Sequence, residues 1–155
     1  MKIIGEKGIG KTLKLFLQIC FYLGAIALIF LPFILNKIGF NLFSSMIVIY
    51  PNGIVLLLIT YKFIGFFDSL KNNKPFCDEN ISIFKTSGIA CAISSLLWFS
   101  DIFYELIFIE TVDIIFYSIL IFLCVLFFGF SIAFFILAEL FKQATEYKKE
   151  NDLTI

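Results

Sequence analysis

Four long runs of apolar residues, separated by short polar or charged segments, dominate the chain. About 20 apolar residues at a rise of 1.5 Å each are enough for a helix to cross the hydrocarbon core of a bilayer. Each run reaches that length, so the pattern predicts an all-α integral membrane protein, a single membrane domain built as a four-helix bundle. The predicted transmembrane helices cover residues 13–35, 51–70, 85–107 and 114–138, with a polar loop over 71–84 and a polar tail over 139–155. Residues 139–149 of this tail are expected to continue the fourth helix as a polar extension.

The start of the second span has two interpretations. Residues 50–53 (YPNG) interrupt a long apolar block, and proline is favoured in the first turn of a helix but unfavourable in its interior. We therefore predict a helix that begins near Pro51, preceded by an apolar loop or interfacial segment over residues 36–49. The alternative is a Pro-kinked helix from Leu42. For the third helix, Asp78, Asn80 or Ser82 is expected to supply the N-terminal cap.

Composition and charge agree with a membrane protein and orient it. The chain is 61% hydrophobic and 15% charged, against about 45–50% and 25% in soluble domains. All twelve cations are Lys, and placing both termini and the 71–84 loop inside leaves only Lys37 outside. By the positive-inside rule, this predicts cytoplasmic termini in a multi-pass protein of the bacterial cytoplasmic membrane. An aromatic belt near the outer boundary is expected from Tyr50, Trp98, Tyr104 and Tyr117.

Small residues indicate where helices approach each other. Gly88, Cys91, Ala92 and Ser95 share one face of the third span, and Gly129 and Ala133 lie four apart in the fourth. Such faces permit close packing of helices in lipid. We expect these faces to pack inside the molecule, in the hairpin that the third and fourth spans form. The alternative is that they form the interface of a homo-oligomer.

Three ionisable residues fall inside the predicted spans: Lys62, Asp101 and Glu105. Ionisable groups at membrane depth are costly and suggest function. Lys62 is interpreted as a Lys that snorkels to the interface, or as a residue of an ion pathway. Asp101 and Glu105 lie near an acidic outer turn. This turn has three interpretations: a solvated surface, a cation site, or a docking surface for a cationic peptide. Two alternative functions follow: a small oligomeric transporter or pore, and an immunity protein against a membrane-active peptide.

Other chemistry is not supported by the sequence. Gly5 to Thr12 (GEKGIGKT) matches the nucleotide-binding pattern G-x-x-x-x-G-K-[ST], but neither a preceding strand nor a nucleotide-binding domain accompanies it, so we expect no nucleotide. The chain lacks His, and its four Cys form no metal-ligand motif. We therefore expect no enzymatic activity, metal or cofactor. The net charge of zero argues against direct binding of nucleic acid, which leaves membrane lipid as the expected surroundings.

Three segments carry a family resemblance. Residues 71–81 (KNNKPFCDENI) with Phe84-Lys85, the tail 146–155 (EYKKENDLTI) and Tyr50-Pro51 resemble the domain of unknown function 2975 family, uncharacterised bacterial four-span membrane proteins. The resemblance covers the whole chain, although Cys77 stands where Ser or Thr is more usual.

Genes of this family frequently lie beside a gene for a small helix-turn-helix regulator. The resemblance therefore implies a non-enzymatic regulatory or sensory partner of a cytoplasmic helix-turn-helix protein. The alternative is a tail that folds back on the loop over 68–82 and serves only structure. The candidate partner-binding residues are Pro75, Phe76, Glu150, Asn151, Asp152, Leu153, Thr154 and Ile155.

Overall fold

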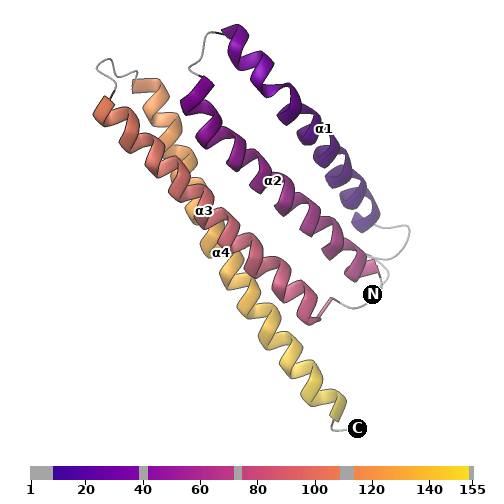
Figure 1. The fold of residues 1–155 in the computed structure, drawn as a ribbon. Helices are drawn as coiled ribbons and strands as arrows, with labels where there is room; N and C mark the ends of the chain where they lie inside the picture. The colour runs from indigo at the N-terminus through magenta and orange to yellow at the C-terminus, as the bar shows by residue number, and fades with distance from the viewer. Residues whose placement is uncertain (1–8, 39–41, 72–74, 109–113, 154–155) are drawn as a thin grey trace.

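The computed structural model describes residues 9–38, 42–71, 75–108 and 114–153 (Figure 1). Within these segments the chain forms four α-helices and no strand: α1 (Ile9–Ile38), α2 (Leu42–Lys71), α3 (Asp78–Phe108) and α4 (Ile114–Leu153). Each helix contains a stretch that is long and apolar enough to cross a membrane. The prediction of an all-α fold with four membrane-spanning helices is confirmed.

The helices pack in the order of the sequence. α1 packs against α2, α2 packs against α3, and α3 packs most extensively against α4. Ring contacts such as Phe63–Phe134 also join α2 to α4. The bundle is therefore open, with α1 and the α3–α4 pair on opposite sides of α2 (Figure 1). The beginning of α1 and the end of α4 lie at one end, which we call the terminal end; α1 and α3 finish at the opposite end.

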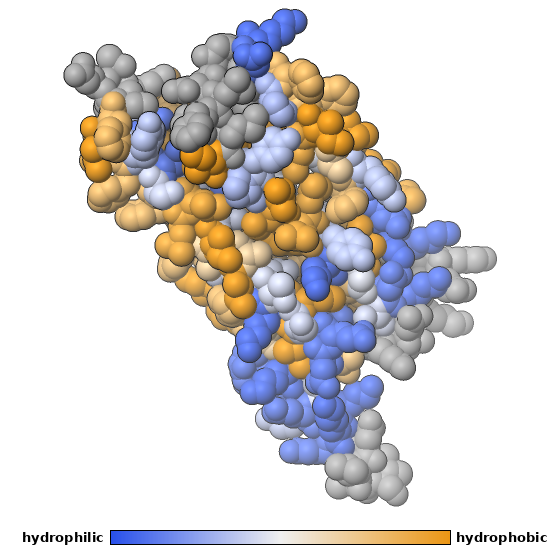
Figure 2. All heavy atoms as spheres, in the orientation of Figure 1, coloured by the Kyte–Doolittle hydropathy of each residue, from blue (hydrophilic) through white to orange (hydrophobic). Residues whose placement is uncertain are grey.

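The surface matches the one a bilayer requires. Large apolar side chains face outward along all four helices, among them Leu23, Leu58, Leu106 and Phe122, each more than half exposed. Figure 2 shows apolar residues over the middle of the molecule and polar residues gathered over the C-terminal part of α4. An apolar surface of this extent fits hydrocarbon and not water.

The α3–α4 pair is joined along a seam of small and polar residues. The hydroxyl of Ser131 donates to the carbonyl of Gly88 over 2.9 Å, and a Cβ added at Gly88 would lie 3.3 Å from the carbonyl oxygen of Ser131. Further along, Ser95 Oγ donates to the carbonyl of Cys124 at 3.1 Å, and Cys124 Sγ donates back to the carbonyl of Ser95 at 3.5 Å. The absence of a side chain at Gly88 thus permits the close approach that these bonds need.

The predicted small-residue faces are confirmed on α3 and wrong on α4. Gly88, Cys91 and Ser95 are buried against the rest of the molecule. Gly129 and Ala133, by contrast, are exposed, and a Cβ at Gly129 would meet nothing within 4 Å. The α4 face that packs inward instead includes Leu120, Phe127 and Ser131. Leu120 and Phe127 bury large apolar side chains there, and Ser131 donates its hydrogen bond to Gly88 of α3.

The predicted start of the second helix is wrong, and the alternative is what the structure shows. α2 begins at Leu42 and contains Pro51 in its interior, so residues 42–49 are helical and not a loop. Pro51 has no N–H to offer the carbonyl of Ile47. Next to that gap, the side-chain amide of Asn52 donates to the carbonyl of Val48 at 2.8 Å. This bond is made to the neighbouring carbonyl and does not replace the one that Pro51 removes, but it fixes the Asn52 side chain beside the gap.

A second proline, Pro32, lies inside α1 and deprives the carbonyl of Leu28 of its backbone donor. The hydroxyl of Tyr50 on α2 donates to this carbonyl over 2.9 Å. A side chain of α2 therefore replaces the hydrogen bond that Pro32 removes from α1, as lipid surroundings demand. Tyr50 thus makes a contact between helices inside the molecule.

The Tyr50–Leu28 bond gives a quantitative prediction. Tyr50→Phe should lower the free energy of unfolding by about 1 kcal/mol, because the freed carbonyl then has no donor. Pro32→Ala restores a backbone N–H at position 32, which can donate to the carbonyl of Leu28. In that background Tyr50→Phe should therefore have almost no effect. Titration of the detergent-solubilised protein with a denaturing detergent measures the free energy of unfolding of each variant. Tyr22→Phe, at an exposed position of α1, is the matched control, and an equal loss in both backgrounds would contradict the pairing.

Candidate functional site

The terminal end is dominated by the long C-terminal helix. α4 continues as a helix for fifteen residues past Ala138, where the predicted span ends, and reaches Leu153. At 1.5 Å per residue this extension is about 22 Å long. Its exposed residues are mostly polar or charged: Glu139, Lys142, Gln143, Glu146, Tyr147, Lys148, Lys149, Glu150 and Asn151.

Aromatic contacts hold the base of the extension to the rest of the molecule. The ring of Phe141 lies 4.8 Å from that of Phe84 on α3, 5.9 Å from that of Phe66 on α2 and 5.8 Å from that of Phe76 in the connector between α2 and α3, measured between centroids. One side chain of α4 therefore contacts three other elements. Rings at such separations attract each other beyond the burial of their area.

Polar contacts continue this attachment along the extension. Thr145 is buried, and its hydroxyl donates to the carbonyl of Phe141. One turn further, the Lys149 ammonium lies 3.4 Å from a carboxylate oxygen of Asp78 at the start of α3. Both charged groups are largely exposed, so the ion pair adds little to the free energy of folding. Its role is to orient the extension relative to α3. At the base of the extension, Lys142 and Glu139 form a further ion pair at 3.9 Å.

The connector is closed by a compact turn. The carbonyl of Cys77 accepts hydrogen bonds from the backbone N–H groups of Asn80 and Ile81, so α3 begins directly after Cys77. The Asn80 side chain is fully buried and donates to the carbonyl of Pro75 at 2.7 Å. The expected capping role of Asp78, Asn80 or Ser82 is therefore wrong: Cys77 precedes the first turn, and Asn80 ties the connector from inside the helix.

We call these elements together the terminal platform: the connector 75–77, the first turn of α3 (78–81) and the α4 extension (139–153). Of the candidate partner-binding residues, Phe76 contacts Phe141 and is 41% exposed. Glu150 and Asn151 lie on the exposed end of α4. Asp152 and Leu153 end that helix, and Thr154 and Ile155 lie outside the described residues. The contributions of Phe141 and Lys149 were not anticipated.

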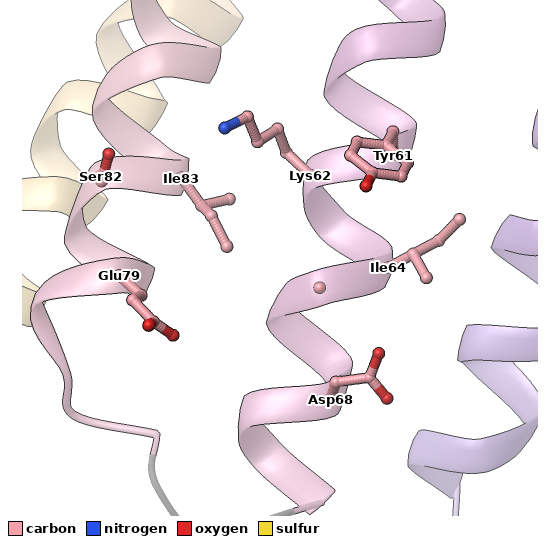
Figure 3. A pocket seen from close by; sticks show the side chains of 8 residues that line it. Tyr61, Lys62, Ile64, Asp68, Glu79, Ser82 and Ile83 are labelled. Atoms are coloured by element: carbon pink, nitrogen blue, oxygen red, sulfur yellow. The ribbon is translucent and has the colours of Figure 1, made fainter.

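A second polar region lies between α2 and α3, where a cavity of about 420 Å³ is lined by Lys62, Asp68, Glu79 and Ser82 among others. Figure 3 shows the side chain of Lys62 extending from α2 toward α3, and not toward the connector as a snorkelling side chain would. Asp68 points to the other side of α2, where it pairs with Lys14 of α1. Glu79 is thus the carboxylate that projects toward the same space as Lys62 (Figure 3).

The structure does not bring the three intramembrane polar candidates together. Lys62 lies nine residues from the end of α2 at the terminal end. Asp101 and Glu105 are half-buried on α3 near the opposite end, and Glu110 and Asp113 lie outside the described residues. A transport route that uses both Lys62 and Asp101 would have to cross most of the bundle.

The described residues hold neither the complete nucleotide-binding pattern nor a cluster of metal ligands. Of the segment that matches the nucleotide-binding pattern, only Ile9 to Thr12 lies in the described chain, and these residues begin α1. Across the four helices and the connector 75–77, no group of three or more Cys, Asp or Glu residues is placed to hold a metal ion.

Comparison with known proteins gives one match. A family model described as "Protein of unknown function (DUF2975)" matches residues 9–155, which is nearly the whole chain. No curated protein and no solved structure matches this chain.

The attachment of the α4 extension can be tested by replacing Phe141. Phe141→Ala removes its three ring contacts and should speed amide hydrogen exchange across residues 139–151 by about tenfold, while residues 114–138 stay protected. Exchange of the full chain in lipid nanodiscs, read by mass spectrometry, measures both segments. Leu140→Ala, at a neighbouring exposed position, serves as control and should change neither. Unaltered exchange in Phe141→Ala would mean that the extension is stable without the aromatic contacts.

Proposed function

The chain belongs to the DUF2975 family of proteins of unknown function, and we propose that it is a membrane-embedded regulatory partner that binds a cytoplasmic helix-turn-helix protein on the terminal platform. It is a multi-pass protein with four apolar helices. The observation that carries the proposal is the α4 extension, a helix that leaves the apolar region and remains attached to the connector through Phe141. A structured polar surface at one end of a membrane protein is suited to binding a soluble partner.

The chemistry of the platform supports a protein ligand. Phe76 is an exposed aromatic side chain beside the charged residues Asp78 and Lys149. Energetically dominant interface residues are commonly aromatic and surrounded by polar groups. Tyr147, which is 68% exposed on the extension, adds a second aromatic group. Because α4 also runs through the bundle, a shift of this helix in the membrane would move the surface to which the partner binds.

The side of the membrane on which this surface lies, and the kind of partner, are both expectations from the sequence. The distribution of Lys predicts that the terminal end faces the cytoplasm of a bacterial cell. The resemblance to the DUF2975 family implies the helix-turn-helix regulator. The role requires no enzymatic step and no cofactor, and the partner keeps its own contact with DNA.

Site-specific photo-crosslinking in native membranes tests the proposal. A photoreactive amino acid in place of Tyr147 should crosslink the full-length protein to a small helix-turn-helix protein, identified by mass spectrometry. The same amino acid in place of Tyr104, exposed near the opposite end, is the matched control and should give no such product.

Variants of the platform sharpen this experiment. Deletion of Glu150–Ile155 should abolish the crosslink from position 147, and Phe76→Ala should reduce it several-fold because an interface aromatic is lost. The absence of a helix-turn-helix protein from the products, or equal crosslinking from both positions, would overturn the proposal.

A further inference from the structure

The open packing of the helices leaves a cavity inside the apolar region. The closely packed helix pairs are α1–α2, α2–α3 and α3–α4, and α1 does not pack against α4. A space therefore remains over α2, between α1 and α4. A space of about 780 Å³ at this place is lined by residues of all four helices, including Ala27, Phe127 and Phe130. Pockets for small molecules commonly enclose about 300–1,000 Å³ and are mostly apolar. This cavity is separate from the terminal platform.

Two polar atoms in the cavity wall have no hydrogen-bond partner. Asn52 is 3% exposed, and its Nδ2 is committed to the carbonyl of Val48. That bond fixes the orientation of the amide and leaves Oδ1 as a buried acceptor with no donor in the described chain. Trp98 Nε1 is likewise buried and without an acceptor among the described residues. Both residues line the cavity.

The register of the helices places Asn52 and Trp98 opposite each other. The rings of Phe66 and Phe84 are in contact, with centroids 5.2 Å apart. Asn52 precedes Phe66 by fourteen residues on α2, and Trp98 follows Phe84 by fourteen on α3. Because α2 and α3 run in opposite directions, equal offsets of two heptads bring the two residues to the same level. The cavity therefore offers one acceptor and one donor at one depth.

That depth restricts the chemical class of the occupant. Asn52 and Trp98 each lie ten residues from the helix end at the side opposite the platform, which is about 15 Å along the axis. Asn52 lies five residues inside the candidate membrane span that begins at Ile47, which is about 8 Å along the axis, so the pair lies within the hydrocarbon core. A phospholipid keeps its charged headgroup at the surface and cannot present it there. A plain hydrocarbon chain would fill the apolar walls but leave both polar atoms unsatisfied.

We propose that the cavity binds a neutral, long-chain lipid alcohol. Its hydroxyl donates to Asn52 Oδ1 and accepts from Trp98 Nε1–H, and its chain lies along the apolar walls, which include Phe127 and Phe130 of α4. A hydroxyl is both donor and acceptor and carries no charge. It therefore meets both unsatisfied atoms with a single group that is stable at this depth. Trp98 is thereby assigned to the cavity.

Trp98 is the only tryptophan of the chain, so intrinsic fluorescence reports on this cavity directly. The experiment compares a brominated sixteen-carbon alcohol with the equally brominated alkane as quenchers, using the full chain in detergent. The alcohol should quench Trp98 saturably, with an apparent affinity about tenfold higher than that of the alkane. Equal quenching by both probes would mean that the cavity accepts hydrocarbon without regard to a hydroxyl, and quenching by neither would mean that it takes no such ligand. Either result overturns the proposal.

Variants of the cavity separate the polar contact from simple filling of space. Asn52→Leu should weaken alcohol binding about tenfold and leave alkane quenching unchanged. Ser69→Ala is the control on the same helix, because Ser69 is outside the cavity and donates to its own helix at the carbonyl of Gly65. Ala27→Phe fills the cavity without changing either polar group and should remove saturable quenching, which keeps the test decisive if Asn52→Leu does not fold. Unchanged alcohol affinity in a folded Asn52→Leu protein would contradict the assignment.

Discussion

The structure depends on one constraint: in lipid, every backbone N–H and carbonyl must find its partner inside the protein. Four continuous helices meet this requirement for most of the chain, and the prolines at positions 32 and 51 create the exceptions. The carbonyl freed by Pro32 is met by Tyr50, and Asn52 lies beside the gap left by Pro51. Tyr50 thereby joins α1 to α2, and Asn52 lines the cavity between the helices.

A different kind of contact unites α3 and α4. Helices in lipid gain no hydrophobic driving force from one another, so close packing and interhelical hydrogen bonds decide which pairs are tight. Gly88, Ser95, Cys124 and Ser131 provide both. This pair then carries the terminal platform, because the α4 extension continues directly from it. The tight α3–α4 pair and the looser attachment of α1 explain why a cavity opens over α2 and a stable surface forms at the terminal end.

The number and type of helices could be predicted because apolar run length alone decides them. Local rules failed where a neighbour supplies what the local sequence lacks. Proline is unfavourable inside an isolated helix, yet α2 runs through Pro51. Hydropathy places the end of the fourth membrane span at Ala138, and the predicted polar extension of the helix beyond it is confirmed. Ala138, Phe141 and Thr145 continue the three- and four-residue spacing of the buried α4 residues. The partners of Phe141 and Trp98 come from other helices, and only tertiary packing shows them.

The regulatory role requires the terminal platform to face the cytoplasm, and Cys77 reports on this directly. Cys77 lies in the connector, whereas Cys20, Cys91 and Cys124 lie within the apolar helices. In cells that produce a variant with those three replaced by Ala, a membrane-impermeant maleimide should label Cys77 only after the cells are opened. Labelling of intact cells to the same extent would place the platform on the outer face and contradict the account.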